Sequence, residues 1–364
     1  MKPIRPVRRL LAPSRILRPT PSQAGGWHSR AELVRAARDA IREGSKSFSA
    51  ASRLFDRNTR ERAWLLYAWC RRCDDIADGQ HRGGALSARG GGAAGRVDGI
   101  RVLTHRALAG QPTADIAFDA FGQVAMEAGL TQQMADDVIE GFALDAAGWR
   151  PRTEADLLRY CYHVAGAVGV MMARLMGVPD HDAEVLDRAS DLGIAFQLFN
   201  IARDVGEDAA AGRCYLPAEW LAEADIPPGE HMKPLYRPAL AAMVARLVAL
   251  AERHEGAARH GAGQLRFRQR WAVLAAANIY GAIGREVRAR GEAAWDQRVH
   301  ISRPAKLRFV MQALREALRR PEPPEEWPAM TRGEILLAIR MAGPIAPMPM
   351  TPLPDDDEGE GEEP

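Results

Sequence analysis

The chain has 364 residues, of which 47% are hydrophobic and 26% are charged. This composition is that of a soluble globular protein, and the length suffices for one large folded domain or two smaller ones. The 49 Lys and Arg residues nearly balance the 47 Asp and Glu residues, which argues against a nucleic-acid-binding protein, because such proteins carry a strongly basic face.

The two ends of the chain differ in composition from its middle. Residues 1–20 contain six basic and no acidic residues, whereas residues 355–363 are mostly Asp and Glu. Of the 24 prolines, five precede residue 22 and ten follow residue 320. We therefore predict a basic, Pro-rich arm without stable structure over 1–27, a folded domain over 28–320, and a Pro-rich acidic tail, largely without stable structure, over 321–364. The arm could contact an anionic membrane face or could equally be a solvated leader.

Helical patterns account for most of the middle of the chain. Ser29 with Glu32 forms a capping box for a first helix that stops at Gly44. Asn58 with Glu61 opens a second helix. Further helices are predicted from Thr131, from Thr153 to Gly177, and over about 183–209, 238–260, 265–291 and 303–319. The alternation typical of strands is absent and the glycine-dense residues 82–99 are predicted to form a loop, so the fold class is all-α.

Three features of the sequence bear on its compartment. The longest unbroken apolar run, 164–173, is shorter than the roughly 20 residues of a membrane-spanning helix, so no spanning segment is expected. Prolines interrupt the basic N-terminus, which therefore does not resemble a secretory signal. The four cysteines are too few for a disulfide framework, and we interpret Cys70 and Cys73, inside a helical pattern, as buried structural thiols rather than a redox pair. We expect a cytoplasmic protein.

The first informative motif lies within residues 67–79, on the second predicted helix. Asp74 and Asp78 are four residues apart and therefore lie one above the other on one face of that helix. The like charges cost about 0.2–0.5 kcal/mol, and carboxylates near a helix C-terminus oppose its dipole by about another 0.3–1 kcal/mol. A cation bound between the two carboxylates would reverse the sign of both effects.

The second motif lies within residues 197–208. At 100° per residue, Gln197, Asn200, Asp204 and Asp208 fall within a stripe about 80° wide on one helix. The neighbouring directions on this helix are apolar, and polar groups are costly to bury there unless a ligand or an ion satisfies them. Gly206, inside the motif, would let a ligand approach the backbone closely.

Two D-x-x-x-D pairs on two helices indicate a site for a hard cation. Mg²⁺ prefers oxygen ligands and is commonly shared between carboxylates and substrate phosphates, so we expect Mg²⁺, or Mn²⁺ in its place, together with a diphosphate substrate. Arg71 and Arg203 beside the motifs strengthen this interpretation. A charged surface without a metal is the alternative, and that is how we interpret the single motif Asp136-Asp137-x-x-Glu140.

Several motifs, in this order along the chain, resemble those of the squalene/phytoene synthase family, and of its bacterial phytoene branch in particular. The resemblance covers roughly residues 35–310. The motifs are Gly44-Ser45-Lys46-Ser47-Phe48, the stretch 67–78, the stretch from Tyr160 to Gly169, the stretch 192–217, and Ala294-Trp295-Asp296-Gln297-Arg298.

Membership of this family would imply an all-α, single-domain isoprenoid-synthase fold, a helical bundle around a central apolar cavity whose mouth carries the two acidic motifs. It would also imply a prenyltransferase that condenses two molecules of geranylgeranyl diphosphate head to head. The product would be phytoene, formed through prephytoene diphosphate in the first committed step of carotenoid biosynthesis, without the NADPH that squalene synthesis needs.

The resemblance also implies roles for individual residues. The metal ions would be held by Asp74, Asp78, Asn200, Asp204 and Asp208, of which the four aspartates are the expected catalytic residues. The polar part of the substrate would be bound by Ser45, Ser47, Arg71, Asp75, Gln197, Asn200, Arg203, Tyr215 and Arg298. The apolar cavity would be lined by Phe48, Tyr160, Val164 and Val168.

Other interpretations of the same residues stay open. Val164 and Val168 could be ordinary packing residues, Ser45 and Ser47 could cap a helix, and His163 is more readily a core histidine than a base. The alternative functions are a C30 synthase that uses farnesyl diphosphate, a non-catalytic membrane-associated relative, and a terpene cyclase. A water-insoluble product and the basic arm point to peripheral attachment on the inner face of the membrane, and the sequence carries no signal for the oligomeric state.

Overall fold

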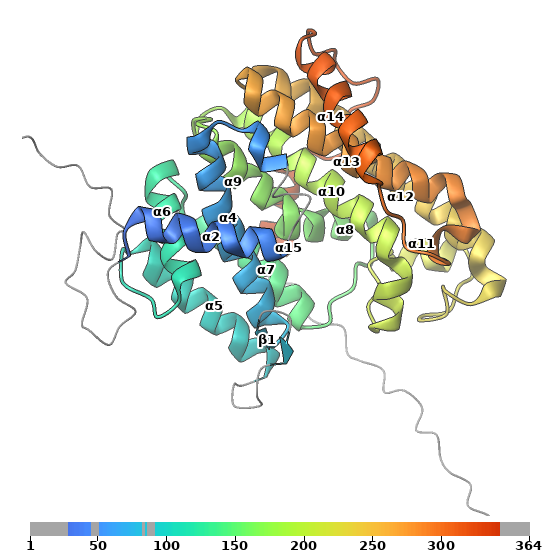
Figure 1. Cartoon of the computed structure of the whole chain (residues 1–364). Helices are drawn as coiled ribbons and strands as arrows, with labels where there is room; N and C mark the ends of the chain where they lie inside the picture. The colour runs from blue at the N-terminus through green and yellow to red at the C-terminus, as the bar shows by residue number, and fades with distance from the viewer. Residues whose placement is uncertain (1–27, 45–50, 82–83, 86–91, 343–364) are drawn as a thin grey trace, which may run out of the picture.

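The computed structural model describes residues 28–44, 51–81, 84–85 and 92–342, which form a bundle of α-helices (Figure 1). The strands among these residues are β1 (Gln80–His81) and β2 (Gly84–Ala85), a two-residue antiparallel pair. The predicted all-α class is therefore confirmed. One large apolar cluster, which extends from Leu33 to Ile335 in the sequence, forms the core of the bundle.

The first helices of the bundle are α2 (Arg30–Gly44), α4 (Arg57–Ala77), α5 (Ala93–Leu108) and α6 (Ile116–Ala128). The capping box predicted at Ser29 is present, because the Glu32 carboxylate accepts the Ser29 N–H at 2.5 Å and the Ser29 hydroxyl accepts the Glu32 N–H at 3.3 Å. α4 begins before the predicted Asn58, because the Asp56 carboxylate caps it by accepting the Thr59 N–H at 3.0 Å.

α5 starts inside the glycine-dense segment that the sequence predicts to be a loop, so this prediction is wrong for residues 93–99. The helix buries Val97, Ile100 and Thr104 against the bundle, where α5 packs on α6 and α7 (Gln132–Ala146). Burial of this face outweighs the helix cost of about 1 kcal/mol for each interior glycine.

The predicted helix from Thr153 to Gly177 is interrupted by a π-helical turn. α8 (Glu154–Cys161) begins at the predicted Thr153 cap, η2 (Tyr162–Gly166) is the π turn, and α9 (Ala167–Leu175) follows. Thr131 likewise caps α7 as predicted, accepting the Met134 N–H at 3.3 Å. A π turn inserts one residue into a helix and so rotates the faces of the residues that follow it.

α10 (Ala183–Ala210) runs through the middle of the bundle and packs against α8, α9, α12 and α13 (Figure 1). It lies very close to the η2–α9 segment, because glycines occupy the crossing. A Cβ atom added at Gly193 would lie 2.2 Å from the Ala165 carbonyl oxygen, and one added at Gly169 would lie 2.2 Å from the Ala189 carbonyl oxygen. The two helices therefore meet backbone to backbone.

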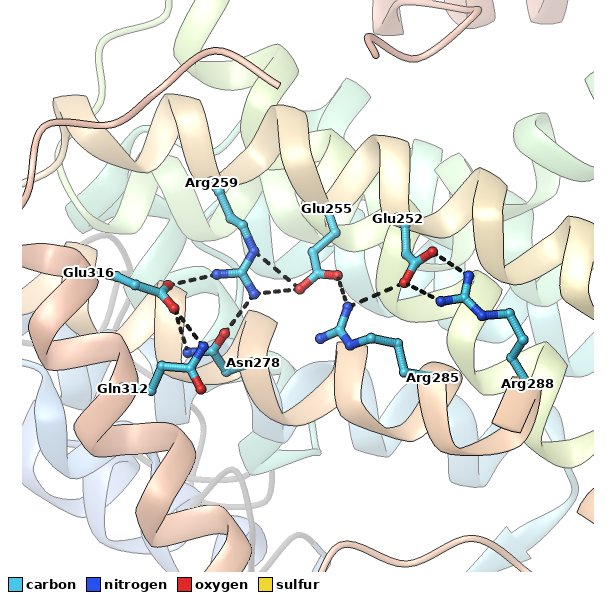
Figure 2. A network of polar contacts seen from close by, with 8 residues as sticks. All are labelled: Glu252, Glu255, Arg259, Asn278, Arg285, Arg288, Gln312 and Glu316. Atoms are coloured by element: carbon cyan, nitrogen blue, oxygen red, sulfur yellow. Dashed lines mark hydrogen bonds and ion pairs between the residues drawn. The ribbon is translucent and has the colours of Figure 1, made fainter. Parts of the chain in front are cut away.

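The C-terminal half contains α11 (Ala218–Glu223), α12 (Arg237–Gly261), α13 (Phe267–Arg290) and α14 (Arg303–Ala317), the last three as predicted. Short turns, η1 (Ser52–Leu54), η3 (Pro234–Tyr236), η4 (Ala262–Gln264) and η5 (Gly291–Trp295), connect the longer helices. A network of ion pairs joins α12, α13 and α14 (Figure 2). Arg259 is at its centre, contacting Glu255, Asn278 at 2.7 Å and Glu316 at 2.7 Å.

The stretch Pro234–Gln264, which contains α12, is long and apolar enough to cross a membrane by length and composition, although the sequence patterns predicted no such segment. In the fold, α12 packs between α10 and α13 and buries Leu247, Val248 and Ala251 completely. The polar groups of Glu252, Glu255 and Arg259 pair with α13 and α14. We interpret this stretch as a core helix of the bundle.

A last helix, α15 (Arg332–Ala342), lies within the segment expected to be a tail. It packs on α8 and α10, with Ile335 fully buried in the core cluster and Arg332 donating to Asp187 at 2.7 Å. The folded body thus reaches Ala342 rather than 320. The apolar face of α15, which follows the prolines of 321–328, is buried against α8 and α10. The arm over 1–27 and residues 343–364 lie outside the described residues.

Candidate active site

A cavity of about 450 Å³ lies among α4, α9, α10 and α13. Val164 and Val168 line it, as the resemblance implied, together with other predominantly apolar residues such as Leu66, Met172, Leu192, Phe196, Ala276 and Ile279. An apolar wall of this kind suits a hydrocarbon chain, because it offers few polar groups for water to bind.

Both acidic motifs lie at the same end of this cavity, which we call the mouth. Cys70 and Phe196 line the cavity, and Asp74 and Asn200 follow them by one helical turn on α4 and α10. The opposite end, which we call the deep end, is lined by Val185, Ala262 and Leu265. Val185 lies about 28 Å from Asp204 along α10, at 1.5 Å per residue.

The first motif is held by arginines. The Arg71 guanidinium lies 2.8 Å from the Asp74 carboxylate and 2.7 Å from the Asp75 carboxylate. Asp75 is 7% exposed, so it is placed to orient Arg71 rather than to meet a substrate. Asp78 lies 3.7 Å from the guanidinium of Arg213, a residue that the sequence prediction did not place in the site.

The second motif is held in the same way. Arg203 donates to its neighbour Asp204 through Nε at 2.7 Å, and Arg298 donates to the same carboxylate at 2.9 Å. A second nitrogen of Arg298 lies 3.0 Å from Glu207. The fold thus brings the guanidinium of Arg298, 94 residues from Asp204 in the sequence, to the second acidic motif. There it could also bind an anionic group.

Gln197 and Asn200 are half-buried on the motif face of α10. In the part of the chain that the structure describes, neither side-chain amide has a hydrogen-bond partner within the protein. Half-buried amides next to two carboxylates are suited to a polar ligand, since buried polar groups are normally satisfied.

Asp145, at the C-terminal end of α7, was not predicted to be part of the site. One of its carboxylate oxygens accepts hydrogen bonds from the Tyr160 hydroxyl at 2.8 Å and from the Tyr215 hydroxyl at 2.9 Å. The two tyrosine rings are stacked with centroids 4.9 Å apart, and the Trp149 ring stacks on Tyr160 at 5.6 Å. Asp145 thus binds the hydroxyls of two adjacent rings in a stack of three.

This arrangement corrects the role predicted for Tyr160. Its side chain is 2% exposed and is not among the residues that line the cavity, because the ring is enclosed by Trp149 and Tyr215. Tyr215 belongs to the same stack, and its hydroxyl contacts Asp145, which links it to the site. Local sequence could have marked Asp145, since it too is a carboxylate in the last turn of a helix, where it opposes the dipole.

The carboxylates of the site influence one another. Burial, together with the Asp78 charge, raises the pKa of Asp74, and burial, together with the Asp204 charge, raises the pKa of Asp208 to about 6. The Asp145 carboxylate contributes to both shifts, and burial raises the pKa of Asp145 itself. Asp145 therefore lies within electrostatic range of both motifs, and the fold brings the two predicted motifs together around it.

The donor set fits a divalent cation. Carboxylates that raise one another's pKa are stabilised when a cation enters between them, and oxygen is the ligand that Mg²⁺ prefers. Among the described residues, no three acidic, His or Cys side chains gather closely enough to hold a metal ion by themselves. Ions held by Asp74 and Asp78 on one side, and by Asp204 and Asp208 on the other, would therefore take further ligands from Asn200, from water or from substrate oxygens.

The remaining predicted residues have separate outcomes. Ser45, Ser47 and Phe48 lie outside the described residues. The motif Asp136-Asp137-x-x-Glu140, expected to be a solvated face, is instead paired within the fold. His105 lies 2.7 Å from Asp136, and the Tyr162 hydroxyl donates to Asp137 at 2.7 Å.

His163 and Cys73 are core residues, whereas Cys70 is partly buried and lines the cavity. His163 is 3% exposed, its Nδ1 lies 2.9 Å from the Asp137 carbonyl oxygen, and burial lowers its pKa. Cys70 and Cys73 are free, and burial raises the pKa of both thiols. These environments suit packing rather than acid–base or redox chemistry.

We predict that Asp145→Asn raises the Mg²⁺ concentration for half-maximal activity about fivefold to tenfold, the factor that corresponds to about 1 kcal/mol of lost attraction. An amide oxygen can still accept both tyrosine hydroxyls, so the near-UV circular dichroism of the ring stack should stay unchanged. Metal titration of activity measures the effect. Asp137→Asn is the matched control. Asp137 is on α7 like Asp145 and also accepts a tyrosine hydroxyl, but it lies about two turns before Asp145. Equal effects of the two variants would contradict the assignment.

Comparison with known proteins identifies the family of the chain. Residues 41–305 match the family model described as squalene/phytoene synthase. A phytoene synthase from Pseudescherichia vulneris is 46% identical over 292 residues, which cover 80% of this chain and 94% of that one. A 15-cis-phytoene synthase from Pantoea ananas is 44% identical over 289 residues, covering 79% and 92% of the two chains.

Solved structures share the fold. A dehydrosqualene synthase in complex with a ligand superimposes with a TM-score of 0.67 and 26% identity, covering 78% of this chain and 96% of that one. A squalene synthase from Alicyclobacillus acidocaldarius superimposes with a TM-score of 0.63 and 22% identity, covering 72% and 95%. The expected isoprenoid-synthase fold is confirmed, and the chain belongs to the squalene/phytoene synthase family.

Proposed function

We propose that the protein is a phytoene synthase, which joins two molecules of geranylgeranyl diphosphate head to head through prephytoene diphosphate to phytoene. This is the first committed step of carotenoid biosynthesis. The observation that carries the proposal is the convergence of two acidic motifs on one end of an apolar cavity. Bacterial relatives at 44–46% identity, named phytoene synthases, support it.

The family is of the divalent-metal-dependent isoprenoid-synthase type. We propose that Mg²⁺ is the metal here, held by Asp74, Asp78, Asp204 and Asp208 with Asn200 beside them. When bound, it neutralises the diphosphate and makes it a better leaving group. Arg71, Arg298 and Arg213 surround the same space and would hold the diphosphate oxygens, since a planar guanidinium binds such groups well.

The apolar wall has its own part in the reaction. Val164, Val168 and Leu192 exclude water that would quench a carbocation. Phe196 and Tyr280 stack with ring centroids 4.2 Å apart at the mouth, and aromatic faces there can favour a passing cation. We propose that the prenyl chains extend from the mouth along α10 toward the deep end. No group in this account requires NADPH.

A C30 synthase that uses farnesyl diphosphate is the second candidate, because the superimposable structures include a dehydrosqualene synthase. The relatives at 44–46% identity carry the phytoene name and so favour the C40 reaction. Product chromatography after incubation with each diphosphate distinguishes the two.

We expect purified protein with Mg²⁺, detergent and geranylgeranyl diphosphate to release a C40 hydrocarbon and inorganic diphosphate, with no change on addition of NADPH. Removal of the metal with a chelator should stop the reaction, and added Mg²⁺ should restore it, with Mn²⁺ tested as a substitute. Absence of any hydrocarbon product would contradict the proposal, whereas a C30 product from farnesyl diphosphate alone would select the second candidate.

We also propose a cytoplasmic protein attached peripherally to the inner face of the membrane. The reasons are the water-insoluble product and the six basic residues within 1–20.

A further inference from the structure

α14 and the residue that caps its C-terminus, Leu318, present an apolar stripe to solvent. At 100° per residue, Leu307, Met311, Leu314 and Leu318 fall within about 60° of one another. Leu307 is 64% exposed, Met311 46% and Leu318 72%. Large apolar side chains that gather in this way on an outer helix mark an interaction surface rather than scattered surface residues.

Basic residues border the stripe. Arg308 and Arg315 follow it on the next row of the helix, about 70–90° away from the centre of the stripe, and Arg319 lies just beyond the end of the helix. In the described part of the chain, none of the three forms an ion pair with a carboxylate. Residues 303–320 contain six basic residues and one acid, Glu316.

The single acid of this segment points away from the stripe. Glu316 accepts from Arg259 at 2.7 Å and from Gln312 at 3.0 Å within the network that joins α14 to α12 and α13 (Figure 2). This network fixes α14 on the bundle, so that its apolar and basic rows are presented together on the outside. We call the stripe and its three flanking arginines the α14 face.

α14 lies one layer of side chains away from the deep end of the cavity, and the α14 face is on the outer side of this helix. Ala262, Leu265 and Val273 line the cavity and also belong to the small apolar cluster that Ala313 and Ala317 of α14 complete. The Arg270 guanidinium donates to the Ala317 carbonyl oxygen at 3.2 Å, which places the C-terminal part of α14 over the start of α13.

We propose that the α14 face docks the protein on an anionic lipid bilayer, with the leucine and methionine side chains in the interface and the arginines on lipid phosphates. An exposed apolar row with a cationic border is the pattern of helices that lie in the plane of a membrane. Docking in this orientation turns the deep end of the cavity toward the lipid. This last point rests on the proposed function, since only a hydrocarbon product would need to leave toward the bilayer.

Charge decides against a second copy of the chain as the occupant. A symmetric dimer through this face would place the arginines of one copy opposite those of the other, and like charges facing each other oppose association. An anionic surface removes this conflict and supplies a partner for each guanidinium.

Vesicle flotation of the full-length protein tests the proposal, using vesicles of phosphatidylcholine with or without about 30% phosphatidylglycerol. The stripe variant carries Leu307→Ser, Met311→Ser and Leu318→Ser, and we expect its partitioning onto anionic vesicles to fall at least tenfold. The arginine variant carries Arg308→Gln, Arg315→Gln and Arg319→Gln. We expect its partitioning onto anionic vesicles to fall at least tenfold and its preference for the anionic lipid to weaken, with the basic residues within 1–20 supplying what remains.

Matched controls replace residues of equal chemistry elsewhere on the surface. Leu235→Ser with Met341→Ser removes two apolar side chains that are each 80% exposed, and Arg38→Gln with Arg42→Gln removes two exposed arginines of α2. We expect the partitioning of both control variants onto anionic vesicles to stay within twofold of that of the unmodified protein. Equal losses in the controls, unchanged partitioning of the α14 variants, or an unmodified protein that does not bind vesicles would each overturn the proposal.

Two further measurements separate this proposal from others. Turnover in detergent should be the same in the α14 variants as in the unmodified protein, because the face lies outside the site, so a failure of docking and a failure of the proposed reaction are distinguishable. Light scattering measures self-association, and dimers that the stripe variant dissociates without any change in vesicle binding would assign the face to a protein contact instead.

Discussion

Asp204→Asn is expected to reduce turnover of geranylgeranyl diphosphate by a factor of 10³ or more, which corresponds to about 4 kcal/mol. The Asp204 carboxylate is contacted by both Arg203 and Arg298, and its charge contributes to the raised pKa of Asp208. The amide keeps the shape and one acceptor but removes the charge that a divalent cation would need. Asp78→Asn should have a similar effect, because it removes the charge that faces Asp74.

The stability of these variants should not fall with their turnover. Each replacement relieves repulsion between neighbouring carboxylates. Asp204→Asn also weakens the ion pairs with Arg203 and Arg298, so a rise in the melting temperature is expected for Asp78→Asn and little change for Asp204→Asn. Thermal unfolding and steady-state turnover measure the two effects. Asp136→Asn is the control from the motif that has the same helical spacing but pairs with His105 instead. Near-full activity of Asp204→Asn or Asp78→Asn would show that the metal assignment is wrong.

Gly193→Ala is expected to destabilise the fold by about 2–4 kcal/mol, the second large effect. The added Cβ atom would lie 2.2 Å from the Ala165 carbonyl oxygen and 2.9 Å from the Gly166 Cα atom, so backbone rather than a mobile side chain must move. Separation of α10 from the η2–α9 segment would also widen the cavity, because Val164, Val168 and Leu192 line it on these elements. Activity should therefore fall at temperatures below the unfolding transition.

Gly99→Ala is the matched control for this prediction. It lies inside α5, and nothing comes within 4 Å of a Cβ atom added there, so the exchange should stabilise the protein by about 0.4–1 kcal/mol. Urea unfolding compares the two variants. An alanine at position 193 that left the free energy of unfolding unchanged would contradict the close approach of the helices.

The acidic motifs could be predicted from sequence because their geometry is local. Asp74 and Asp78, like Asp204 and Asp208, are four residues apart, and helix periodicity alone puts each pair on one face. The position of Asp145 in the last turn of a helix is a local signal, but its place between the two motifs could not be predicted from helix periodicity. Its hydroxyl partners Tyr160 and Tyr215 lie 15 and 70 residues away in the sequence, so only the tertiary fold brings them to the end of α7.

The fold was predictable to a similar degree and for similar reasons. The long helices α10, α12, α13 and α14 follow from an apolar periodicity that spans many turns. α5 and α15 were missed because glycines and prolines nearby are local signals for loops, while the burial that stabilises these helices comes from distant residues such as those around Ile335. The π turn at Tyr162–Gly166 has no local signal at all.

The stack of Trp149, Tyr160 and Tyr215 gives the protein an intrinsic optical reporter. Both tyrosine hydroxyls of the stack donate to Asp145, which lies within electrostatic range of both acidic motifs. A cation or a diphosphate that enters the site changes the electric field along these rings, and the emission and near-UV absorption of indole and phenol respond to such fields. Occupancy of the site can thus be followed by intrinsic fluorescence or near-UV absorption, without turnover and without an added label.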